Sequence, residues 1–225
     1  MSATETQGNS YYWGQDLDGE PDTLWGLEGY THAVGFFLGH PSSDIFKTCM
    51  AMVDGENLLK HEQGLASRDY DLYHYDFAGG WLKRDDDKER DSKTSYVVVH
   101  HFWAKEGKRD ELIHGLSVLA EETKEAQGTY GVVQSCGVLQ EVRDVTMATL
   151  WLRCVPPGDL GTSMQVTDHD YRTKTETDFK TYQSSNLYRK AVTEDLKEGG
   201  AVVAKTELHH AQNFNGHIDA APISA

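Results

Sequence analysis

An internal repeat is the feature that most restricts how this chain can fold. The tripeptide Thr-Leu-Trp at residues 23–25 returns at 149–151, and Phe-Lys-Thr at 46–48 returns at 179–181. Weaker matches follow the same order: Gln7, Gly8 and Gln15 with Gln127, Gly128 and Gln134, and Leu72, His74 and Gly80 with Leu208, His210 and Gly216. Matches that keep their order while their spacing drifts indicate a duplicated structural unit. The sequence therefore predicts two related halves packed into one body.

A charged segment divides these halves. The 225 residues suffice for two units of about a hundred residues each. The run KRDDDKERDSK at residues 83–93 is nearly all charge, which is typical of a solvated linker. The domain prediction is a shortened repeat at 10–82, the linker at 83–93, a complete repeat at 94–218 and a tail at 219–225.

The second half has the pattern of a ferredoxin-like unit. Hydrophobic and β-branched runs predict strands at 95–103, 130–142, 146–155 and 201–210, with helices at 108–127 and 170–196. The order β-α-β-β-α-β is that of a split βαβ unit. The first half offers strands at 11–15, 23–30 and 70–82 and a helix that begins near Ser43, and lacks the opening strand and helix. We expect an α+β fold in which two antiparallel sheets meet face to face, with helices outside.

Composition excludes several classes of protein. A net charge of −15 argues against a nucleic-acid partner, because an acidic chain repels phosphate. No apolar run is long enough to span a membrane, and the first ten residues lack the basic and apolar regions of a secretory signal. The cysteines Cys49, Cys136 and Cys154 are odd in number and widely spaced, which favours free thiols and a cytoplasmic location.

No cofactor motif is present, so we expect neither a cofactor nor a metal. The sequence contains no glycine-rich phosphate loop, no paired CxxC and no HExxH. The pairs His100–His101 and His209–His210 sit in predicted strands, where neighbours point to opposite faces, so neither pair can chelate from one side. A site with one member of each pair remains open, and so does the interpretation that these are ordinary core or surface histidines.

Aromatic residues and histidines share the predicted strands. The aromatic residues are Trp13, Trp25, Tyr30, Trp81, Trp103, Tyr130 and Trp151, and the histidines are His74, His100, His101 and His210. Large rings in strands usually fill a core. A histidine beside an aromatic wall can also take a proton from a phenol or enol, which suits a flat, hydrophobic, acidic substrate.

Two short motifs resemble the antibiotic biosynthesis monooxygenase family. Glu28, Tyr30, Phe37, His40 and Phe46 are similar to that family's pattern of Glu-x-Tyr, an apolar stretch, a histidine and an aromatic residue. The phrase WAKEGKRDEL at residues 103–112 is similar to its turn into an acidic helix start. The resemblance implies a dimeric α/β barrel, formed here within one chain. It also implies cofactor-free oxygenation of phenolic or polyketide-type compounds of secondary metabolism, in which the substrate carbanion reduces molecular oxygen.

The two halves depart differently from that pattern. Cys154 stands where the first half has Glu28, and no histidine in the second half matches His40. We therefore expect only one working pocket. The complete half is the favoured host because a cavity needs walls on both sides, and the first half is the alternative if His40 matters.

Residue roles follow from this hypothesis. His101 is the expected base, or His100 if the strand faces the other way; Arg153 would stabilise an enolate oxygen, and His40 is a further catalytic candidate. The predicted substrate-binding residues are Trp103, Tyr130, Trp151, Trp25, Tyr30, His74 and His210.

Other functions fit the same sequence. One alternative is a cyclase or isomerase that uses the same base without oxygen, and another is a non-catalytic barrel that binds small molecules. The shortened first half predicts an uncovered sheet edge near residues 11–30, which a second copy of the chain would cover in a homodimer.

Overall fold

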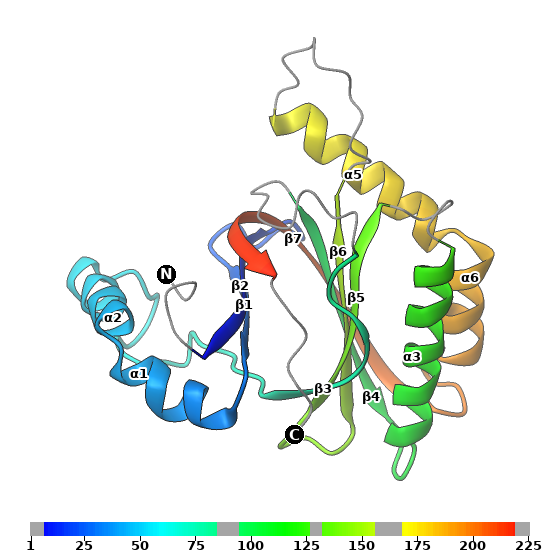
Figure 1. The fold of residues 1–225 in the computed structure, drawn as a ribbon, viewed down its shortest axis with the longest axis horizontal. Helices are drawn as coiled ribbons and strands as arrows, with labels where there is room; N and C mark the ends of the chain where they lie inside the picture. The colour runs from blue at the N-terminus through cyan, green and yellow to red at the C-terminus, as the bar shows by residue number, and fades with distance from the viewer. Residues whose placement is uncertain (1–6, 85–94, 127–131, 156–167, 219–225) are drawn as a thin grey trace.

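One curled antiparallel sheet of seven strands forms the centre of the molecule. A computed structural model describes residues 7–84, 95–126, 132–155 and 168–218. Helices α3 and α6 cover the strands of the second repeat, while α1 and α2 lie on the opposite side of the molecule, beyond β1 and β2 (Figure 1). In chain order the elements are β1 (Gly8–Asp16), β2 (Leu24–Tyr30), the π-helix η2 (Gly35–Gly39), α1 (His40–Ser42), α2 (Asp44–Glu56), β3 (Tyr75–Trp81), β4 (Tyr96–Ala104), α3 (Arg109–Glu125), β5 (Val133–Glu141), β6 (Met147–Cys154), α5 (Asp168–Gln183), α6 (Asn186–Tyr188), the π-helix η3 (Arg189–Asp195) and β7 (Val203–Ile218).

The strand order confirms the ferredoxin-like repeat. The full order is β2-β1-β7-β4-β6-β5-β3, in which the second repeat contributes the block β7-β4-β6-β5. That block is the order of a split βαβ unit. The first repeat joins it on both sides, because β1 pairs with β7 and β3 pairs with β5. The expectation of two sheets that meet face to face is therefore wrong: both repeats share one continuous sheet, since β1 and β3 of the first repeat extend the second repeat's block on either side.

The same order shows where the shortened repeat is incomplete. If β1, β2 and β3 correspond to β5, β6 and β7, the missing counterpart of β4 belongs between β2 and β3. Those two strands are the edges of the observed sheet. Within the residues that the structure describes, the opening strand that the first repeat lacks thus corresponds to the gap between the two edge strands.

Local sequence explains the helix boundaries. Ser43 caps α2 by accepting a hydrogen bond from the backbone N–H of Phe46, and Asn57 ends the helix in the left-handed region with a φ of 53°. Helix α3 carries Asp110 and Glu111 in its first turn, where the helix dipole favours negative charge. No helix in the described part of the chain is long and apolar enough to cross a membrane.

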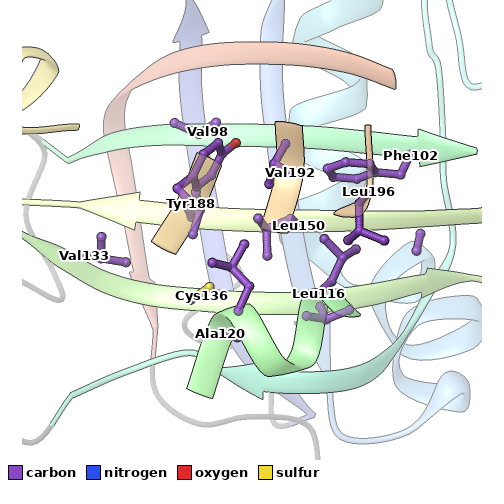
Figure 2. Close-up of a cluster of buried hydrophobic side chains, with 14 of the residues drawn as sticks. Val98, Phe102, Leu116, Ala120, Val133, Cys136, Leu150, Tyr188, Val192 and Leu196 are labelled. Carbon is purple, nitrogen blue, oxygen red and sulfur yellow. The ribbon is translucent and has the colours of Figure 1, made fainter. Parts of the chain in front are cut away.

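The main core lies between the sheet and the helices of the second repeat. Leu112, Leu116 and Leu119 recur at helical spacing on α3 and are fully buried. They belong to the same cluster as Leu150 of β6 and Tyr188 of α6; Figure 2 shows Leu116, Leu150 and Tyr188 packed between strands and helices. Helix α2 of the first repeat contains no buried residue. The smaller second cluster combines Tyr12 and Leu82 with Val97, Leu139 and Trp151 of the second repeat. Most of the stabilising apolar burial therefore belongs to the second repeat.

Candidate functional site

His101 lies on the inner face of the sheet, on the side away from α3. Its side chain is 3% exposed, and its Nδ1 atom lies 2.8 Å from the hydroxyl of Thr149, the residue paired with it on β6. Thr149 Oγ1 in turn donates to the phenol oxygen of Tyr75 at 3.0 Å. The other ring nitrogen, Nε2, is buried and has no hydrogen-bond partner within the described residues. A buried polar atom without a protein partner calls for a physical explanation, such as a bound water or a catalytic role.

Three aromatic side chains lie close to the imidazole ring of His101. The ring of His101 lies 5.2 Å from that of Tyr73, 6.0 Å from that of Trp103 and 6.2 Å from that of Trp25. Trp25 is held in place by a 2.9 Å hydrogen bond from its indole N–H to Asp16. The two repeats therefore build the site together, since β2 supplies Trp25 and β4 supplies His101.

Tyr73 reaches His101 from the segment 57–74, which connects α2 to β3. At one end of this segment Lys60 forms an ion pair with Asp22 of the β1–β2 turn at 3.6 Å. At the other end Arg143, in the β5–β6 turn, donates to the backbone oxygen of Leu72. The segment thus extends from one turn of the sheet to the other.

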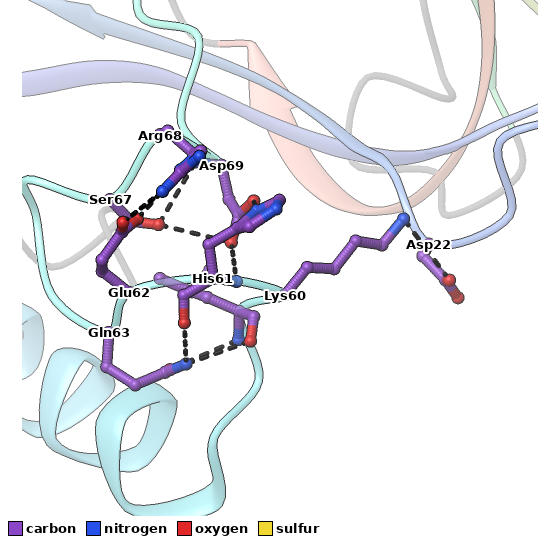
Figure 3. Close-up of polar contacts among 9 residues, drawn as sticks. Asp22, Lys60, His61, Glu62, Gln63, Ser67, Arg68 and Asp69 are labelled. Atoms are coloured by element: carbon purple, nitrogen blue, oxygen red, sulfur yellow. Dashed lines mark hydrogen bonds and ion pairs between the residues drawn. The ribbon is translucent and has the colours of Figure 1, made fainter.

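Internal polar contacts fix the shape of this connecting segment. Figure 3 shows the bonds between His61 and Asp69 and between Arg68 and Glu62. Gln63 also donates to a backbone oxygen within the segment, that of Leu59, at 3.0 Å. These contacts tie together the part of the segment between Leu59 and Asp69. Tyr73 itself donates a hydrogen bond to the carboxylate of Asp71 at 3.0 Å.

Burial and nearby charges keep His101 neutral. Desolvation, with a smaller contribution from the neighbouring His209, lowers the pKa of His101 to about 4, although Glu207 acts in the opposite direction. Glu207 lies directly across from His101 on β7. At neutral pH His101 is therefore an uncharged base, with a carboxylate nearby that would stabilise its protonated form.

His100 faces the opposite side of the sheet. Its Nδ1 lies 3.1 Å from the hydroxyl of Tyr188, and its ring lies 4.0 Å from that of Phe102, within the helix-covered core. Burial lowers the pKa of His100 to about 3. The strand therefore presents His101, rather than His100, to the inner face.

Arg153 and Trp151 lie farther along the inner face. Arg153 is 1% exposed and donates from Nε to the hydroxyl of Ser135 at 3.2 Å. Its strand position is opposite Val97, four residues from His101, which corresponds to about 13 Å along a strand. Trp151 is buried against Tyr12, with ring centroids 5.7 Å apart. The register thus separates Arg153 from His101 along the inner face, and Trp151 is part of the core.

His40 belongs to a separate cluster in the first repeat. Its Nε2 lies 3.5 Å from the carboxylate of Glu28, which also accepts a 2.8 Å hydrogen bond from Tyr30. The ring of Phe46 lies 4.5 Å from that of His40. The residues of the Glu-x-Tyr motif therefore contact one another, apart from the His101 site.

The remaining predicted pocket residues are dispersed. His74 packs against Phe37 at a ring distance of 5.6 Å. His210 bonds to Asp18 at 2.8 Å and lies near the core ring of Tyr96. Tyr130, like most of the charged linker, lies outside the described residues.

One histidine of each adjacent pair, His101 and His209, lies on the inner face of the sheet. The rings of His101 and His209 lie 5.6 Å apart. Within the described residues, no group of three or more histidine, cysteine, aspartate or glutamate side chains is placed to hold a metal ion.

Sequence reasoning missed three members of the site. Thr149 is the first residue of the repeated Thr-Leu-Trp tripeptide, and Tyr73 and Tyr75 alternate within an aromatic-rich run. Both signals were visible in the sequence. Neither indicates that these residues meet His101, because that contact depends on strand register and on the path of the connecting segment.

Comparisons with known proteins find similarity in structure alone. No protein-family model matches the chain, and no curated protein matches its sequence. A candidate monooxygenase from Fusobacterium nucleatum superposes with a TM-score of 0.68 at 10% identity, covering 98% of this chain and 82% of the other. A second candidate monooxygenase, from Lactobacillus acidophilus, has a TM-score of 0.63 at 8% identity, covering 100% and 86%.

A third solved structure extends this similarity. An anthrone oxidase-like protein superposes with a TM-score of 0.56 at 14% identity, covering 100% of this chain and 84% of the other. At such low identity these likenesses show the fold rather than the reaction. The chain has the dimeric α/β-barrel fold of these structures, with two ferredoxin-like repeats, the first of them shortened, in one polypeptide.

Proposed function

We propose that this protein is a cofactor-independent, monooxygenase-like enzyme that acts on an aromatic or polyketide-type small molecule of secondary metabolism. The observation that carries the proposal is the unpartnered Nε2 of His101, buried among Trp25, Tyr73 and Trp103. The fold shared with two candidate monooxygenases and an anthrone oxidase-like protein supports the same reaction class.

The proposed chemistry starts with proton transfer to His101. Nε2 accepts a proton from an acidic C–H of the substrate, and Glu207 stabilises the imidazolium that forms. The resulting carbanion supplies electrons to molecular oxygen. For a methylene group flanked by aromatic rings, one oxygen atom becomes the carbonyl oxygen, and the other leaves as water with both methylene hydrogens. No external reductant is required, because the substrate carbon provides the electrons.

Oxygen uptake with a panel of anthrones and naphthols tests this proposal. We expect uptake of one O2 per anthrone converted to the quinone. Conversion of the substrate without oxygen uptake would instead indicate the cyclase or isomerase alternative. Thermal stabilisation by the compounds without any turnover would indicate a binding protein.

We also propose that the protein works as a homodimer that covers the first repeat. Tyr11 and Tyr12 of β1 are already buried within the chain, so the open surface lies elsewhere than residues 11–30 alone. Most of the exposed large apolar side chains fall within residues 24–72, including Phe37 at 59% and Leu38 at 65% exposure. An apolar surface of this kind is typical of a protein contact, and a second copy covers it without new sequence.

Light scattering tests the dimer. At micromolar concentration we expect twice the chain mass of 25.2 kDa, and a Phe37→Glu, Leu38→Glu double variant should have the monomer mass. Val142→Glu and Val145→Glu, exposed apolar positions in the second repeat, serve as controls that should leave the mass of the dimer unchanged. A wild-type protein with the mass of a single chain would contradict the prediction.

A further inference from the structure

We propose that Thr149 is a positioning residue that holds His101 in one tautomer, with hydrogen on Nδ1 and none on Nε2. The inference rests on the proposed function only in regarding Nε2 as the proton acceptor. The arrangement involves three side chains from three strands: Tyr75 of β3, His101 of β4 and Thr149 of β6.

The two hydrogen bonds of the Thr149 hydroxyl determine which tautomer of His101 is present. A threonine hydroxyl has one hydrogen to donate and can accept from another group. In the structure Thr149 Oγ1 donates to Tyr75 at 3.0 Å. Its contact with His101 Nδ1 at 2.8 Å must then be one in which Nδ1 carries the hydrogen and Thr149 accepts it. A neutral imidazole has only one N–H, so Nε2 is left with its lone pair.

The state of Tyr75 is compatible with this direction. Burial raises the pKa of Tyr75 above its usual range, so Tyr75 stays a neutral phenol whose oxygen has lone pairs that can accept the hydrogen of Thr149. Thr149 itself is 1% exposed, so water does not compete for its hydroxyl. The hydroxyl is therefore held between two fixed partners.

The surroundings of Nε2 give an independent reason to expect the tautomer with hydrogen on Nδ1. This atom is buried and has no partner among the described residues. A buried N–H without an acceptor is rarer in proteins than an acceptor atom that lacks a donor. The tautomer without a hydrogen on Nε2 therefore has the lower free energy in the ligand-free protein. In this tautomer Nε2 can accept a proton from a substrate.

Nitrogen-detected NMR of the histidine rings tests the inference without any substrate. In the wild-type protein we expect His101 to show hydrogen on Nδ1 and a bare Nε2. Thr149→Val preserves the shape of the side chain but removes the acceptor, so His101 should shift toward the Nε2–H tautomer, whereas Thr149→Ser should retain the wild-type signature. His100, on the other face of the sheet, serves as an internal reference that should not change. Hydrogen on Nε2 in the wild-type protein, or an unchanged His101 signature in Thr149→Val, would overturn the inference.

Kinetics separate this inference from the proposed function. Thr149→Val should lower kcat by roughly 10- to 100-fold, the effect of losing a residue that orients a functional histidine, and Thr149→Ser should restore most of it. Wild-type turnover combined with full kcat in Thr149→Val contradicts the positioning role. The expected tautomer signatures without turnover of any substrate contradict the proposed function and leave the positioning role supported.

Discussion

Replacing His101 by glutamine is expected to lower kcat by about 10²- to 10⁴-fold, the range that a general base contributes. Glutamine fills a similar volume and can bond to Thr149, but it cannot take a proton at neutral pH. The measurement is the steady-state rate of oxygen uptake with the best anthrone or naphthol substrate. Because His101 is buried, circular dichroism and the melting temperature of the variant must first show that it is folded.

Two further variants complete this experiment: one is a control, and the other tests whether the reaction takes place in the first repeat instead. His114→Gln changes an exposed histidine on α3 and should leave kcat unaltered. His40→Gln changes the cluster in the first repeat, where Glu28 and Tyr30 contact His40. Loss of activity in His40→Gln, with full activity in His101→Gln, would place the reaction in the first repeat and contradict the proposed site.

Acidification from pH 7 to pH 5 is expected to lower the free energy of unfolding by about 4 kcal/mol through two buried histidines. Burial lowers the pKa of His101 to about 4 and that of His100 to about 3, below the ordinary value of 6.5. The unfolded chain therefore binds more protons than the folded chain below pH 6.5, so stability falls as pH decreases through this window. Each histidine contributes about 2 kcal/mol over these two pH units, which is a large share of a typical domain's stability.

Urea unfolding at pH 7, 6 and 5 measures this effect. His101→Gln should show about half of the loss that the two buried histidines cause, because His100 is then the only one of these two that titrates; His74, whose pKa is lowered by partial burial, adds a smaller loss to both proteins. The carboxylate of Asp144, whose pKa is lowered by its hydrogen bond from Thr146, titrates below this range and does not confuse the result. A wild-type free energy of unfolding that is constant between pH 7 and pH 5 would contradict the burial of both histidines.

Much of the fold was predictable because its signals are local. The β-branched and aromatic run in β4, the cap at Ser43 and the spacing of Leu112, Leu116 and Leu119 each depend on neighbours in the sequence. The repeat added a non-local constraint, which was enough to predict two ferredoxin-like units. The joining of both repeats into one sheet was not predictable, because the pairs β1–β7 and β3–β5 connect strands far apart in the sequence.

The site was predictable only in part, for the same reason. His101 was identified as a candidate base, but the choice between His100 and His101 depends on which strand face is covered by helices. Trp25 was identified as a pocket residue, yet its contact with His101 comes from the curl of the sheet between β2 and β4. Arg153 was assigned to the same reacting group, and the register of β4 and β6 separates it from His101.

A crystal structure of the protein with a bound, slowly reacting naphthol or anthrone analogue tests the central claim most directly. The account predicts ligand density within hydrogen-bond distance of His101 Nε2, with the aromatic rings of the ligand against Trp25, Tyr73 or Trp103. Displacement of Tyr73 from its position over His101 would accompany binding. Density against His40 and Phe46 in the first repeat, with His101 still buried and unpartnered, would contradict the account.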